Sequence, residues 1–148
     1  DLQAAPAGKA PTFLIHAGKD PLGANLDRVQ VVKGWLDVKG NAREKVYDVA
    51  WSGARKPGKN GKLPSVGSTV DVKEASYSNS IGAAELSAVW TDPEFDPDQR
   101  AFYYARVIQI PTPRWTAYDE KYFGAVIDPR APKTIQDRAY SSPIWYTP

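Results

Sequence analysis

The fold class of this chain is decided by the ten residues Ala101-Phe102-Tyr103-Tyr104-Ala105-Arg106-Val107-Ile108-Gln109-Ile110. Aromatic and β-branched side chains dominate this stretch, and Arg106 is its single charge, a composition typical of a central β-strand. Pro111 and Pro113 follow directly. Because proline donates no backbone hydrogen bond, we expect the strand to end there.

Shorter stretches of similar character lie along the rest of the chain. Residues 26–35 place Val29 and Val31 on one face, and a turn at 37–41 joins them to residues 45–51 as a hairpin. Residues 81–90 would also suit a short helix, but we interpret them as a strand. Further strands are expected at 12–17, 68–72 and 144–146. Short strands separated by turns predict an all-β fold, an immunoglobulin-like β-sandwich with long irregular loops.

The domain organisation follows from length and composition. With 148 residues, 42% of them hydrophobic, the chain is long enough for one core. We expect residues 1–11 to be a linker or irregular lead-in, residues 12–148 to form one β-sandwich domain, and the turn-rich stretch up to Pro132 to lack regular structure. The chain contains no Met, so we expect it to derive from a longer protein.

Composition also excludes several functions. The net charge of +2 is spread along the sequence, so we expect no nucleic-acid partner. No apolar run approaches the roughly 20 residues of a membrane span, so no membrane insertion is expected. Without Cys there is no disulfide or thiolate metal site, and the single histidine, His16, is interpreted as a sheet-face or interface residue. We expect no catalytic residue and no cofactor within this chain.

One acidic segment is a candidate metal site. Asp92, Glu94, Asp96 and Asp98 alternate with other residues, so that their carboxylates could converge on a hard cation such as calcium. The segment lacks the mid-loop glycine and the distant bidentate glutamate of the EF-hand loop. A solvated acidic turn is the alternative interpretation.

The segment after the two prolines is a candidate ligand-binding or cleft-lining loop. It carries Arg114, Trp115, Tyr118 and Asp119. Arg114 could clamp a phosphate or carboxylate, but it could equally pair with Asp119 or stack on Trp115. We expect the loop to be rigid and to present these side chains to a cleft.

The many aromatic residues support a rival function. A carbohydrate or cell-surface binding module would present a contiguous outward patch among Trp115, Tyr118, Tyr122 and Trp145. The same ring types also fill sandwich cores, and we assign Trp51 and Trp90 to the core. A third class, an enzyme complete within these residues, would have to use carboxylates such as Asp92, Asp96 and Asp119.

The ordered blocks of the sequence resemble a known family. They cover nearly the whole chain: residues 26–35, 44–52, 92–97, 102–107, 110–115 and 142–146. In this order they resemble the C-terminal part of a bacterial family labelled a domain of unknown function. Its members are similar to metallohydrolases of the PHP (polymerase and histidinol phosphatase) type and to carbaryl-hydrolase-like proteins.

The resemblance implies a function for the parent protein. In such proteins an N-terminal domain carries the metal-binding His-x-His motif, and a β domain follows. We therefore expect this chain to be a non-catalytic C-terminal accessory domain of a metal-dependent (phospho)esterase-like hydrolase. It would pack on the N-terminal catalytic domain of the same protein, which holds the divalent metal, and line its cleft. Relatives of this type are often exported, which favours a periplasmic location.

Overall fold

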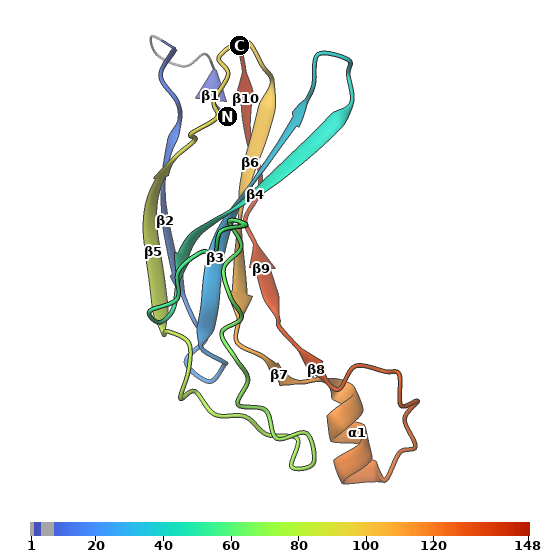
Figure 1. Cartoon of the computed structure of the whole chain (residues 1–148). Coiled ribbons are helices and arrows are strands. Elements are labelled where there is room, and N and C mark those ends of the chain that lie inside the picture. Colours follow the sequence, from blue (N-terminus) through green and yellow to red (C-terminus); the bar gives the residue numbers. More distant parts are fainter. Residues whose placement is uncertain (1, 4–7) are drawn as a thin grey trace.

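The computed structural model describes residues 2–3 and 8–148 and forms an all-β sandwich with long irregular loops (Figure 1). This confirms the predicted fold class. The principal strands are β2 (Thr12–Gly18), β3 (Leu26–Leu36), β4 (Ala42–Trp51), β5 (Glu85–Thr91), β6 (Ala101–Gln109) and β10 (Ile144–Thr147). The short strands are β1 (Leu2–Gln3), β7 (Thr112–Pro113), β8 (Thr134–Ile135) and β9 (Arg138–Tyr140).

The larger layer is a sheet with the order β1-β10-β6-β3-β4, in which β9 also pairs with β6. Strand β6 bonds β3 on one side and β10 and β9 on the other, so the central position predicted for residues 101–110 is confirmed. The predicted hairpin is confirmed as β3 and β4. Within residues 1–11, Leu2–Gln3 pairs in parallel with β10, while residues 1 and 4–7 lie outside the described residues.

The smaller layer consists of β2 and β5, which pair antiparallel without a register shift. Strand β5 lies over β3 and β4, and Phe13 and Ile15 of β2 pack on the main core of Val31, Tyr103 and Tyr146. Trp90 packs against the same core, as predicted, and Trp51 is half-buried. Inward and outward side chains alternate along β2, and this alternation explains why the strand could be predicted from the sequence.

A buried ion pair joins the two layers at one end of the core. Nζ of Lys33 lies 2.6 Å from Oδ2 of Asp92 and donates to the carbonyl of Glu94 at 2.7 Å. The hydroxyl of Tyr103 donates to the same Asp92 oxygen at 2.8 Å. Burial, followed by this bond to Asp92, raises the pKa of the Tyr103 phenol above its usual range.

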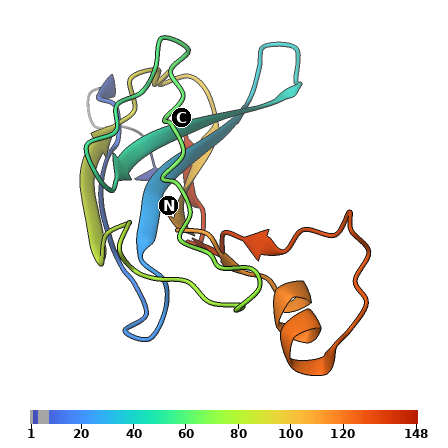
Figure 2. The ribbon, with the colours of Figure 1, turned by 60° about the horizontal axis from the view of Figure 1, so that its bottom comes forward.

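The long connection from Ser52 to Ala84 runs past the sheet towards the helix, as the two ribbon views show (Figures 1 and 2). Arg55 anchors its beginning, because its guanidinium donates to the carbonyls of Asp27 and Pro64, each at 2.9 Å. The strand predicted at 68–72 is wrong. Only an isolated bridge between Asp71 and Ser76 forms there, since this polar stretch lacks a neighbouring strand to pair with.

The expectation of irregular structure up to Pro132 is also wrong, because Trp115–Phe123 forms helix α1. Arg114 is extended (φ −82°, ψ 163°) and begins the helix, and Gly124 ends it in the left-handed conformation (φ 62°). The hydroxyl of Thr116 donates to the carbonyl of Pro132 at 2.8 Å and so connects α1 to the segment leading into β8. Among the described residues, no helix has the length and apolar character to cross a membrane.

Candidate functional site: an open groove in the sandwich

The sandwich is open along one side, between β2 and the edge of the larger sheet. A hollow of about 440 Å³ lies there, with a second of about 450 Å³ that shares His16, Val107 and Ala139 with it. The first hollow is lined mainly by apolar and aromatic side chains: Phe13, Ile15, Val31, Tyr103, Val107, Ala139 and Ile144. We call the two hollows together the open groove.

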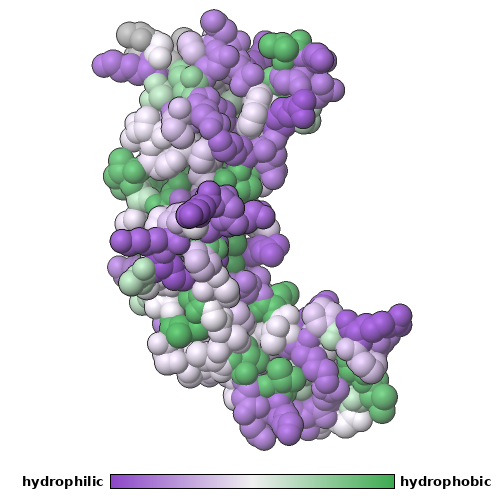
Figure 3. All heavy atoms as spheres, viewed as in Figure 1, coloured by the Kyte–Doolittle hydropathy of each residue, from purple (hydrophilic) through white to green (hydrophobic). Residues whose placement is uncertain are grey.

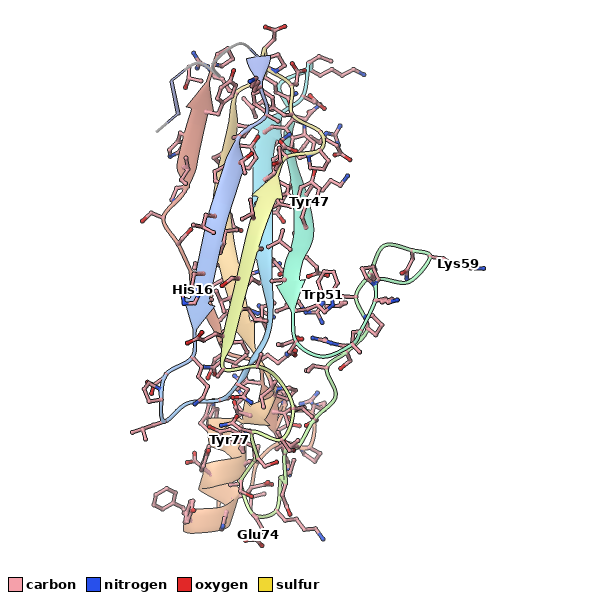
Figure 4. The ribbon with its side chains drawn as sticks, turned by 90° about the vertical axis from the view of Figure 1, so that its left-hand side faces the viewer. His16, Tyr47, Trp51, Lys59, Glu74 and Tyr77 are labelled. Atoms are coloured by element: carbon pink, nitrogen blue, oxygen red, sulfur yellow. The ribbon has the colours of Figure 1, made fainter. Side chains whose placement is uncertain are left out.

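The groove exists because the two layers differ in width. The smaller layer ends at β2, whereas the larger sheet continues past β6 to β10 and β9. Figure 4 faces the smaller layer and shows β10 extending beyond β2 on the side away from β5. The inward side chains of β2, Phe13 among them, consequently remain only partly buried. An apolar groove of this kind is the type of surface that binds another chain or a ligand.

His16 lies at the rim of the groove (Figure 4). Its Nδ1 lies 2.8 Å from the hydroxyl oxygen of Ser87 on the neighbouring strand β5. A catalytic triad needs a carboxylate on the other ring nitrogen. Among the described residues no carboxylate is hydrogen-bonded to His16, so the pair supports the interpretation of His16 as a sheet-face residue.

The acidic segment does not gather its four carboxylates. Asp92 is buried against Lys33, and Glu94 pairs with Lys45 and accepts from the hydroxyl of Tyr47 at 3.1 Å. The hydrogen bond from Lys45 lowers the pKa of Glu94. Asp96 accepts from the backbone N–H of Asp98 at 3.0 Å, as in an ordinary turn. Over residues 2–3 and 8–148, no three His, Asp or Glu side chains are placed to hold a metal ion together.

The candidate residues Arg114, Trp115, Tyr118 and Asp119 lie on the helix and at its start, not in the rigid loop that the sequence predicts. The guanidinium carbon of Arg114 sits 5.8 Å from the centre of the Trp115 ring, which is the stacking alternative of the sequence analysis. The helix projects at the end of the molecule opposite the C-terminus (Figure 1). None of these four residues lines the open groove.

In the part of the chain that the structure describes, exposed aromatic rings form two separate groups. On α1, the rings of Tyr118 and Tyr122 stack at 6.4 Å, and Trp115 is 57% exposed. Green hydrophobic residues are visible at this end of the molecule in Figure 3. Trp145 belongs to another group on the outer face of the larger sheet, where its ring lies 5.1 Å from that of Phe102. The four aromatic residues of the predicted patch are therefore not contiguous.

The fold and the groove define an all-β sandwich domain with one uncovered side. The family model described as "Protein of unknown function (DUF3604)" matches residues 1–148, and the chain belongs to this family. No curated protein matches the chain, and no solved structure does.

Proposed function

We propose that this chain is a non-catalytic accessory domain that packs on the catalytic domain of a larger, metal-dependent hydrolase of the PHP type. The open groove is the observation that carries the proposal. It leaves core side chains such as Phe13 and Ile15 half-exposed beside an apolar hollow of about 440 Å³. Another domain of the same protein would bury these side chains and gain the hydrophobic free energy that the isolated sandwich lacks.

The hydrolase part of the proposal rests on the resemblance of the sequence blocks to PHP-type and carbaryl-hydrolase-like proteins. The metal and its histidine ligands would belong to the catalytic domain. Among the described residues, carboxylates such as that of Asp92 already form ion pairs, in this case with Lys33. An accessory role asks for no catalytic group here, only for a surface that fits the catalytic domain.

Hydroxyl-radical footprinting tests the packing. The probe oxidises exposed side chains, and Ile144, whose side chain faces the groove, is 38% exposed in this chain. We expect Ile144 to react readily in the 148-residue chain and to be protected in the complete protein, while Val38, which lies outside the groove, reacts equally in both. Equal reactivity of Ile144 in the two proteins would contradict the packing.

Hydrolysis of a chromogenic phosphoester tests the assignment to a hydrolase. With Mn²⁺ or Zn²⁺ added, the complete protein should turn over the substrate, the 148-residue chain should not, and a chelator should abolish turnover. The substitution Ala139→Arg would fill the groove with a charged side chain and should lower this activity. Ala54→Arg, at an exposed position in the long connection, is the matched control and should leave it unchanged. Turnover by the chain alone would favour an enzyme complete within these residues.

The aromatic face of α1 supports a second candidate, a carbohydrate-binding module. Trp115, Tyr118 and Tyr122 are spaced three and four residues apart and therefore share one side of the helix. Flat exposed rings stack well on sugar faces. Retention of the chain on glycan columns, lost in Tyr122→Ala but kept in Phe102→Leu, would support this candidate over the first.

A further inference from the structure

Strand β2 has one edge paired with β5 and one edge with no strand partner among the described residues. The direction of its backbone groups follows from the bonds that flank the strand. The N–H of Asp92 donates to the carbonyl of Pro11, and the N–H of Lys19 donates to the carbonyl of Ala84. In an antiparallel pair, every second residue bonds the partner, so Phe13, Ile15 and Ala17 face β5.

The alternate residues Thr12, Leu14, His16 and Gly18 therefore direct their backbone N–H and carbonyl groups away from β5. In the part of the chain that the structure describes, none of these backbone groups makes a hydrogen bond. Water can satisfy them in the isolated domain. A row of free donors and acceptors of this kind is also a template for a further strand.

The edge carries none of the features that normally protect an exposed strand. From Thr12 to Gly18 there is no proline and no Lys, Arg, Asp or Glu, and the pairing with β5 contains no bulge. Leu14 is 80% exposed on the outer face. Natural proteins usually protect such edges with charges, prolines or a covering element. Among the described residues, no element covers the free edge of β2.

The open groove lies beside the free edge of β2. It also lies over β9 and β10, the strands of the larger sheet that extend past β2. A strand added to β2 would extend the smaller layer over β9 and β10. Because side chains alternate along a strand, every second one would enter the hollow formed by Ile15, Val107 and Ala139, and the others would lie beside Leu14. The hollow is mainly apolar, which favours apolar inward side chains.

We propose that an extended segment of the catalytic domain adds to the free edge of β2 as a third strand of the smaller layer. The segment carries apolar side chains at alternate positions. This inference rests on the proposed function and adds the mode of attachment, strand addition. A second copy of this chain fits less well, because two-fold pairing of β2 with itself would bring the overhanging β9 and β10 of each copy into the same space.

Residue-resolved hydrogen exchange of the 148-residue chain and the complete protein tests the proposal. In the chain, the amides of Leu14, His16 and Gly18 should exchange fast, whereas those of Ile15 and Ala17 should be protected. In the complete protein, the three edge amides should exchange more slowly than in the chain, by a factor on the order of 100. Fast exchange of these three amides in the complete protein would overturn strand addition.

The substitution Leu14→Pro provides a second test. It removes an N–H that β5 does not use, so the 148-residue chain should remain folded with a similar midpoint of thermal unfolding. In the complete protein, it should restore fast exchange at His16 and Gly18. Leu14→Ala removes the same side chain but keeps the N–H, and the two amides should stay protected. Protection that survives in Leu14→Pro would contradict the proposal.

The two experiments separate the inference from the proposed function. If the groove side chains become protected from radicals while the edge amides still exchange fast, the domains pack without strand addition. If neither changes, both proposals fail. If the edge amides of the chain are already protected in the 148-residue protein with a concentration-dependent onset, a second copy is the occupant and the inference is wrong.

Discussion

Replacing Asp92 by asparagine removes the negative charge from the buried contact between the layers. The side chains of Lys33 and Asp92 are 3% and 0% exposed, and their charged atoms lie 2.6 Å apart. In Asp92→Asn the ammonium of Lys33 keeps its bond to the carbonyl of Glu94 but loses its counter-charge. The asparagine side-chain oxygen can still accept from the hydroxyl of Tyr103, but the amide nitrogen then replaces the oxygen that accepts from the backbone N–H of Glu94 at 2.9 Å, so that second bond is lost.

The size of the effect follows from the burial of the pair. Removing one partner of a buried ion pair costs about 3–5 kcal/mol, because the remaining charge stays in a poorly solvated place. Because Lys33 keeps its bond to the carbonyl of Glu94, we expect a loss of unfolding free energy at the lower end of this range, about 3 kcal/mol. A domain of this size is stable by about 5–15 kcal/mol, so the variant should still fold, with a much smaller margin.

Urea unfolding followed by tryptophan fluorescence measures this loss, since Trp35 and Trp90 pack on the same core. Asp96→Asn is the matched control, because Asp96 is exposed and makes only a turn hydrogen bond, and it should change the free energy of unfolding by less than about 0.5 kcal/mol. Adding Lys33→Met to Asp92→Asn should recover stability, since it removes the buried positive charge that has lost its counter-charge. A loss below about 1 kcal/mol in Asp92→Asn, or no recovery in the double variant, would refute this reasoning.

Two further changes test local features. A Cβ at Gly34 would lie 2.2 Å from Cζ of Phe102, so Gly34→Ala should cost about 1–3 kcal/mol in urea unfolding, whereas Gly18→Ala, with nothing within 4 Å of the new Cβ, should cost far less. The backbone N–H of Asn41 lowers the pKa of Asp37 to about 2 from 3.8. Because the folded pKa is the lower one, the stability that wild type has over Asp37→Asn should be complete above about pH 4 and should vanish as the pH falls towards 2. An Asp37 titration midpoint near 4 by NMR would contradict this.

The sequence predicted the strands whose side chains alternate clearly. Residues 12–17 and 26–35 alternate with a period of two, and residues 101–110 are dense in aromatic and β-branched side chains; each of the three forms a strand within one residue or so of the expected bounds. The stretch 68–72 alternates as well, but it finds no partner, and pairing depends on where the rest of the chain lies. Alternation thus identifies a possible strand, and the tertiary fold decides whether it pairs.

Helix α1 could not be recognised from the two prolines and the aromatic residues that surround it. Arg114 offers no side-chain cap and the first turn holds no acidic residue, so the usual signals of a helix start are absent. Lys121 in the last turn and Gly124, which ends the helix, are local features typical of a helix end. The candidate residues Arg114, Trp115, Tyr118 and Asp119 therefore lie on a helix and at its start, where the sequence predicts a loop.

The open groove could not be predicted from the sequence. It arises because β9 and β10 pair with β6 and extend past β2, and those pairings join segments far apart in the chain. Ala139 and Val107 look like ordinary small core residues in the sequence. Only their place beneath an uncovered edge gives them a role in the proposed contact.

The parallel pairing of β1 with β10 affects how fast the domain can fold. Leu2 pairs with Tyr146, so this contact forms only after nearly the whole chain has been brought together. Closing such a long loop costs conformational entropy before any contact repays it, and sheets built from distant segments fold in milliseconds to seconds. We therefore expect a slow folder, in which the aromatic residues of β6 stay accessible to chaperones until β10 has docked.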